Sequence, residues 1–96
     1  MRADEILRES LTAMNARARE RDHREGERSM RRIVAAFNAL YAEKVASQGG
    51  MLTEVDGWRF MEVLKLGRGQ GPDEFIDGAA YAGLAGEAAA KERGDV

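Results

Sequence analysis

Apolar residues recur at intervals of three and four along most of this chain, and glycine-bearing or fully polar stretches interrupt the pattern. Such an interval places side chains on one face of an α-helix. No part of the sequence alternates with the period of two that is typical of a half-buried β-strand. The 96 residues are enough for one hydrophobic core but not for two. We therefore expect a single all-α domain over residues 1–96, built as a compact bundle of about four helices.

The first half of the chain predicts two helices. The first spans residues 3–21, and its apolar stripe consists of Leu7, Leu11, Met14 and Ala18. The fully polar stretch 22–26 ends in a glycine and should break this helix. The second helix should begin at Glu27 or Ser29 and end before Ser47. Because its apolar stripe is too wide for one light contact, we expect it to be the central helix of the bundle.

The third predicted helix begins at Glu54. Thr53 and Asp56 have the Thr-x-x-Asp spacing of a capping box, in which each side chain satisfies a backbone N–H group. The helix that follows is apolar nearly all round, so we expect it to be the most buried element. Trp58 lies among apolar neighbours at helical spacing and should anchor the core rather than offer a stacking platform.

The fourth predicted helix spans residues 73–91, after a glycine-rich loop that ends in Pro72. The loop lacks the spacing of a phosphate-binding loop. Glycine inside a helix costs roughly 1 kcal/mol relative to alanine. The three glycines of this helix therefore predict that another backbone packs closely against it; they are Gly78, Gly83 and Gly86. The polar tail 92–96 should be frayed.

Charge and composition exclude several classes of protein. The chain has no cysteine and one histidine, which excludes disulfides and the usual zinc sites. The net charge of −2 does not favour nucleic acid as a partner. No apolar run approaches the ~20 residues of a membrane span, and the N-terminal stretch lacks the apolar centre of a signal peptide. We expect a cytoplasmic protein with no membrane partner.

The charges are distributed unevenly along the chain. Residues 17–32 hold seven arginines against four acids, whereas residues 50–96 hold five basic residues against nine acidic ones. One interpretation is a solvated helix surface with i,i+4 ion pairs. The other is an anion-facing patch, for which Arg24 and Arg28 are candidate binding residues.

Three stretches between residues 26 and 87 carry a family pattern. They are Gly-Glu-Arg-Ser-Met at 26–30 with Val-Ala-Ala-Phe-Asn-Ala-Leu at 34–40, Leu-Thr-Glu-x-Asp-Gly-Trp-x-Phe-Met at 52–61 with Leu-Lys at 64–65, and Asp-Gly-Ala-Ala-Tyr-Ala-Gly-Leu-Ala-Gly-Glu at 77–87. These motifs resemble an uncharacterised family of small proteins encoded in tailed bacteriophages and prophages. The resemblance implies a phage protein in the host cytoplasm and does not define an activity.

Glu74 and Asp77 carry a more distant resemblance, to the MazG-like all-α nucleoside triphosphate pyrophosphohydrolases. Those enzymes hold magnesium between helices that carry Glu-x-x-Glu and Glu-x-x-Asp, because carboxylates at i and i+3 share one helix face. Glu74 and Asp77 match the second signature. The first signature is missing, and Glu62 lies between basic residues at i−3 and i+3. The two acids are thus either magnesium ligands or first-turn acids favoured by the helix dipole.

Three further residues are candidates for binding. Lys65 and Arg68, near the end of the third predicted helix, could face Asp77 across the following loop. They would form either a salt bridge between helices or an anion pocket. The hydroxyl of Tyr81 needs a partner if it is buried, and Lys65 or Asp77 could supply one.

Two functions follow from these patterns. The small size, the acid-leaning second half and the incomplete catalytic set favour a non-enzymatic protein without a cofactor, which binds a host or phage protein as an interaction factor or inhibitor. The alternative is a nucleotide-binding protein or a reduced, magnesium-dependent pyrophosphohydrolase. In either case we expect a homo-oligomer, most simply a dimer, because four short helices cannot cover the apolar surface that the third and fourth helices carry.

Overall fold

The computed structural model describes residues 1–21 and 29–94 of the chain. The described residues form five α-helices and no strand, which confirms the all-α prediction. The helices are α1 (Ala3–Arg21), α2 (Ser29–Leu40), α3 (Ala42–Ser47), α4 (Glu54–Arg68) and α5 (Pro72–Arg93). Within the described ranges, none of these helices is both long enough and apolar enough to cross a bilayer.

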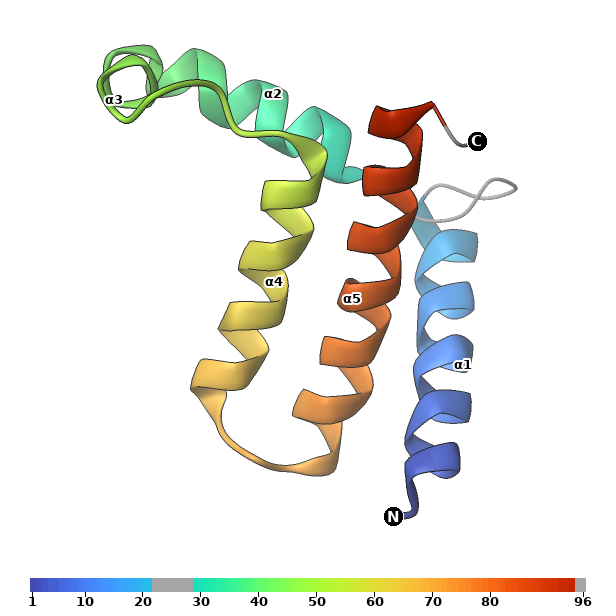
Figure 1. Ribbon diagram of the computed structural model, residues 1–96. Helices are drawn as coiled ribbons and strands as arrows, with labels where there is room; N and C mark the ends of the chain where they lie inside the picture. Colours follow the sequence, from blue (N-terminus) through green and yellow to red (C-terminus); the bar gives the residue numbers. More distant parts are fainter. Residues whose placement is uncertain (22–28, 95–96) are drawn as a thin grey trace.

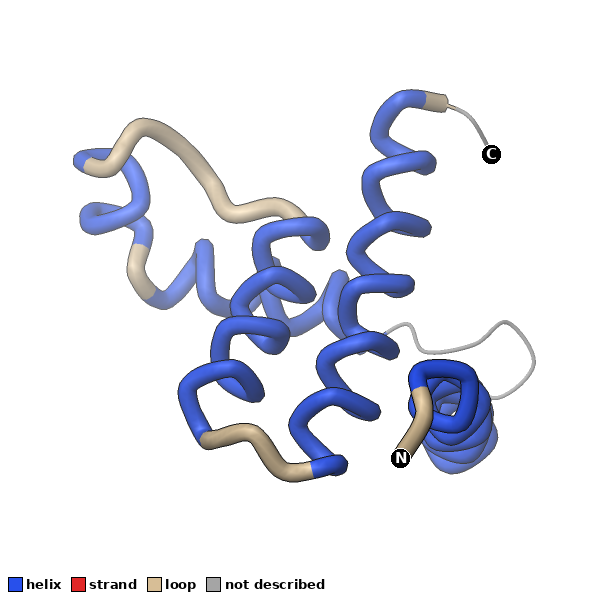
Figure 2. Tube along the Cα trace, turned by 60° about the horizontal axis from the view of Figure 1, so that its bottom comes forward, coloured by secondary structure: helices blue, strands red, loops and turns tan. Residues whose placement is uncertain are grey.

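Helices α1, α4 and α5 run side by side and form the body of the molecule (Figure 1). Helix α5 lies between the other two and packs against both, so α5 is the central helix. Figure 2 shows the same arrangement from another side, with the short loop 69–71 joining α4 to α5. The prediction that the second helix is central was wrong, because the width of an apolar stripe does not show where its helix lies in the bundle, and Ile33, Phe37 and Leu40 of α2 are exposed.

Small side chains make the close packing of the body possible. Helix α5 buries three alanines, Ala80, Ala85 and Ala88, and α1 buries Ser10 and Ala18. Helices that meet through such residues can approach closely, whereas large residues would hold them apart. The larger members of the core are Met30, Val34, Trp58 and Leu84.

The predicted apolar stripe of α1 is only partly the buried one. Ala18 is buried and Met14 packs against the core, but Leu7 and Leu11 are more than half exposed. The face that α1 turns towards α5 instead contains the buried Ser10. The stripe was misplaced because Leu7 and Leu11 carry the strongest apolar signal, while the close contact with α5 requires a small side chain.

Helices α2 and α3 form an arm that leaves the body. The arm comprises residues 29–52, and α2 crosses one end of α4 while α3 lies at the far end of α2 (Figure 1). The chain bends at Tyr41, whose ψ of 38° departs from helical geometry, so the predicted single helix is divided in two. Two hydrogen bonds join Asn38 of α2 to Leu52, the last residue of the arm. The Asn38 side chain donates to the Leu52 carbonyl and accepts from the Leu52 N–H, both at 2.9 Å.

The start of α4 agrees with the prediction. The Thr53 hydroxyl accepts a hydrogen bond from the Asp56 N–H at 3.3 Å, and the Asp56 carboxylate accepts one from the Thr53 N–H at 2.8 Å. Trp58 is 3% exposed, which confirms it as a core anchor. Helix α4 is nevertheless not the most buried element. Its neighbours α5 and α2 cover two sides and leave other large apolar side chains exposed, namely Phe60, Val63 and Leu66.

The glycines of α5 do not mark a close contact within the chain. A Cβ atom added at Gly78, Gly83 or Gly86 would meet no neighbouring atom within 4 Å, so no helix of the described chain packs closely at these positions. The close approach is at Gly57 of α4, where a Cβ atom would overlap the Met30 side chain and lie 2.9 Å from Val34 Cγ1. Helix α5 also extends beyond its predicted end, to a left-handed cap at Gly94 with φ of 79°.

Candidate functional site

Asp77 lies at the junction of the three body helices. Its Oδ2 is 2.9 Å from Lys65 Nζ on α4, and its Oδ1 is 3.1 Å from an Arg17 guanidinium nitrogen on α1. The side chains of Arg17, Asp77 and Lys65 are 17%, 26% and 16% exposed. Each carboxylate oxygen therefore has a cationic partner in a partly desolvated setting, where such hydrogen bonds are strong.

Two aromatic rings extend this cluster towards the core. Tyr81 follows Asp77 by one helical turn and stacks on Trp58 with ring centroids 5.8 Å apart and an interplanar angle of 21°. The Arg17 guanidinium carbon lies 5.0 Å from the centroid of the Tyr81 ring, within cation–π range. Tyr81 thus contacts both the buried indole of Trp58 and the guanidinium group of Arg17.

The predicted site residues are only partly brought together. Lys65 and Asp77 meet across the α4–α5 turn as an ion pair, and Tyr81 lies beside them. Arg68 is exposed at the end of α4, and the partners that the structure shows for Asp77 are Lys65 and Arg17. The two other candidates, Arg24 and Arg28, lie outside the described residues.

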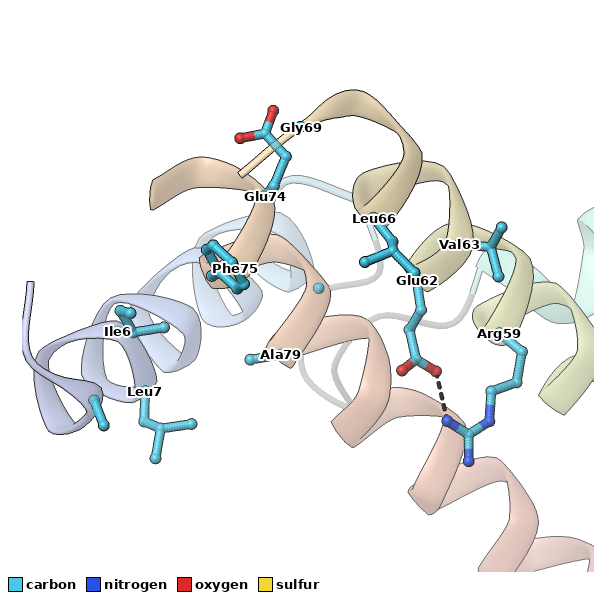
Figure 3. A pocket seen from close by; sticks show the side chains of 12 residues that line it. Ile6, Leu7, Arg59, Glu62, Val63, Leu66, Gly69, Glu74, Phe75 and Ala79 are labelled. Carbon is cyan, nitrogen blue, oxygen red and sulfur yellow. Dashed lines mark hydrogen bonds and ion pairs between the residues drawn. The ribbon is translucent and has the colours of Figure 1, made fainter. Parts of the chain in front are cut away.

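The two predicted magnesium ligands have different surroundings. Asp77 is held by two cations, whereas Glu74 lies at the edge of an apolar groove (Figure 3). The described residues contain no group of three or more acidic or histidine side chains that could hold a metal ion together. A magnesium ion on Asp77 would have to displace Lys65 or Arg17, so the metal site stays a prediction from the motif alone.

Arg17 is the member of the cluster that the sequence analysis missed. It lies 60 positions from Asp77, so no local spacing connects the two. A weaker signal is present: Ser10, Met14 and Arg17 lie at intervals of four and three and therefore share a helix face. A charged residue on a core-facing stripe needs a partner of opposite charge.

A groove of about 630 Å³ opens between the three body helices. Figure 3 shows Ile6 and Leu7 on α1, Val63 and Leu66 on α4, and Phe75 and Ala79 on α5 around it. On the α5 side, the small residues Gly78 and Ala79 line the groove together with the large side chain of Phe75. The charged residues at its edge are Arg59, Glu62 and Glu74, and Arg59 pairs with Glu62 at 2.9 Å.

The arm presents a second apolar surface. Ile33, Phe37 and Leu40, which we call the arm stripe, occupy positions i, i+4 and i+7 of α2 and are all exposed, Leu40 at 75%. Tyr41 extends the stripe, with its ring centroid 4.9 Å from that of Phe37. Arg31 and Arg32 are exposed at the start of the same helix, which contains no acidic residue.

Comparison of the chain with protein-family models, with curated proteins and with solved structures found no match. The resemblances to the phage family and to the pyrophosphohydrolases accordingly stay predictions from the motifs. The two apolar surfaces and the Asp77 cluster are therefore the features that indicate its function.

Proposed function

We propose that this protein acts by binding another protein, without catalysis, and that the arm stripe is its binding element. The observation that carries the proposal is the exposure of Ile33, Phe37 and Leu40 at positions i, i+4 and i+7 of one helix. Helices that insert into a groove of a partner use anchors at this spacing. A helix with such a stripe on a free surface is an interaction site rather than an ordinary surface helix.

The side chains of the arm stripe indicate the kind of partner surface. Arg31 and Arg32 precede the stripe on α2, but they line one pocket together with Glu54 and Glu92, so acidic side chains of this chain lie near them. A matching partner would therefore offer an apolar groove that accepts Ile33, Phe37 and Leu40. In keeping with the phage-type motifs, we place this partner, a host or phage protein, in the host cytoplasm.

A photo-crosslinking amino acid at position 40 tests this proposal in host cells. We expect cross-links to one partner, which the substitution Phe37→Asp removes because it buries a charge in the apolar contact. The matched control is the same crosslinker at Leu11, another exposed leucine outside both the arm and the groove. Equal cross-linking from positions 11 and 40, or none from position 40, would contradict the proposal.

The nucleotide alternative has less support. Its candidate residue Lys65 is paired with Asp77 at 2.9 Å, so a phosphate would have to break this ion pair. A thermal-shift screen of nucleotides with magnesium separates the two functions, since a ligand at 100 times its Kd adds about 2.7 kcal/mol of stability. A shift that Asp77→Asn abolishes would favour a nucleotide site that includes Asp77.

A further inference from the structure

Helix α1 contributes little to the hydrophobic core. Among the described residues, the buried members of the core cluster all belong to α2, α4 and α5; they are Met30, Val34, Trp58, Leu84, Ala85 and Ala88. The contribution of α1 to this cluster is Met14, which is only partly buried. The core that α2, α4 and α5 share therefore depends little on α1.

The buried residues of α1 are small. They are Ser10 and Ala18, and neither carries a large apolar side chain. The larger apolar residues Leu7 and Leu11 are 62% and 55% exposed. The free energy gained by burial rises with the apolar area removed from water. Helix α1 therefore gains little hydrophobic stabilisation from its position on α5 (Figure 1).

Arg17 provides the specific polar contact between α1 and the rest of the body. Its guanidinium group lies 3.1 Å from Asp77 Oδ1 and 5.0 Å from the centroid of the Tyr81 ring, both on α5. The Arg17 side chain is 17% exposed, so this ion pair is partly desolvated and stronger than a surface pair. Arg8, by contrast, pairs with Asp4 of its own helix and adds nothing to the contact with α5.

We infer that α1 is a lid, which opens as a unit while α2, α4 and α5 stay folded, and that the Arg17–Asp77 ion pair holds it closed. Segments with few buried apolar contacts open at a free energy below that of global unfolding. Opening uncovers the Tyr81 ring and Asp77 Oδ1, and it removes the wall of the groove that Ile6 and Leu7 form. The lid is a different element from the arm stripe, so the inference does not rest on the function proposed for the arm.

Amide hydrogen exchange of the full chain tests the lid. An isolated helix of 19 residues is marginal in water, so an opened α1 loses its backbone hydrogen bonds and its amides exchange. After correction for intrinsic rates, we expect the amides of residues 10–18 to exchange at least about tenfold faster than those around Trp58 and Leu84. Equal protection of α1, α4 and α5 would mean that α1 opens only when the whole molecule unfolds, and would overturn the inference.

Three glutamine substitutions test the ion pair that holds α1 closed. Arg17→Gln should raise exchange in α1 about tenfold or more, because it removes a hydrogen bond between charged groups, and should leave α4 and α5 unchanged. Arg8→Gln, the same change on the same helix, breaks only the exposed pair with Asp4 and should raise it by no more than about twofold. Lys65→Gln removes the other cation of Asp77 and should leave α1 closed.

Unchanged protection of α4 and α5 in the same measurement shows that each variant is folded. Equal effects of Arg17→Gln and Arg8→Gln on α1 would overturn the role of the Arg17–Asp77 pair. An effect of Arg17→Gln that is equally large in α1, α4 and α5 would overturn the lid itself. The cross-linking result for the arm stands or falls separately, because it uses other residues.

Discussion

The glycines at positions 57 and 83 occupy opposite environments within similar helices. Gly57 is buried, and a Cβ atom there would overlap Met30 and crowd Val34, so the contact between α2 and α4 depends on a missing side chain. Gly83 is exposed, and a Cβ atom there would meet nothing within 4 Å. The sequence does not distinguish the two, since both lie inside apolar helical segments. Only the path of α2 decides which of them touches a neighbour.

Alanine substitutions should therefore act in opposite directions at these two glycines. We expect Gly57→Ala to lower the free energy of unfolding by about 1–3 kcal/mol through overpacking. Gly83→Ala should raise it by up to about 1 kcal/mol, since alanine favours the helix. Urea denaturation followed by circular dichroism measures both. A stabilising Gly57→Ala would show that α2 does not pack against α4 as described.

At the scale of single elements, local signals predicted the ends of helices well. Helix α1 has its expected bounds, and α4 begins at Glu54 because Thr53 and Asp56 cap it. These features depend on residues within one turn of each other. The break at Tyr41 and the exposure of Leu66 depend instead on which elements lie nearby, and apolar periodicity contains no such information.

The cap of α4 predicts a specific ranking of two substitutions. Thr53→Ala removes the acceptor for the Asp56 N–H and should cost about 0.5–2 kcal/mol of stability. Thr53→Ser keeps a hydroxyl in place and should cost much less. Chemical denaturation of the three proteins side by side gives the comparison. If the alanine variant matched the unaltered protein, the reciprocal box would not contribute to the start of α4.

For the whole molecule, the Asp77 cluster is the polar contact that joins all three body helices. The contact between Lys65 and Asp77 could be predicted from the sequence, because the two residues flank one short loop. It could not predict Arg17, since the contact requires α1 to lie against α5, which no local pattern specifies. The same limit applies to the arm and the groove. Both surfaces consist of residues that the sequence marks as apolar without showing whether they face the core.

Asp77→Asn should destabilise the whole body rather than one helix. It leaves Arg17 and Lys65 facing each other without their shared counter-charge, and we expect a loss of about 1–3 kcal/mol. The control is Asp4→Asn, because Asp4 also pairs with two arginines, Arg2 and Arg8, but is 54% exposed. That variant should lose less than about 1 kcal/mol. Equal thermal and urea stabilities for the two variants would mean that the Asp77 cluster does not hold the helices together.

The two hydrogen bonds between Asn38 and Leu52 also have a practical consequence. Because the chain departs at residue 38 and returns at residue 52 to the same point, the segment between them starts and finishes side by side. Its tip includes Gly49 and Gly50, with open space around both. A foreign sequence spliced in at this tip would leave the register of α4 unchanged, since a connection whose ends already meet tolerates added length. The tip of the arm is thus a natural place to graft an epitope or a reporter.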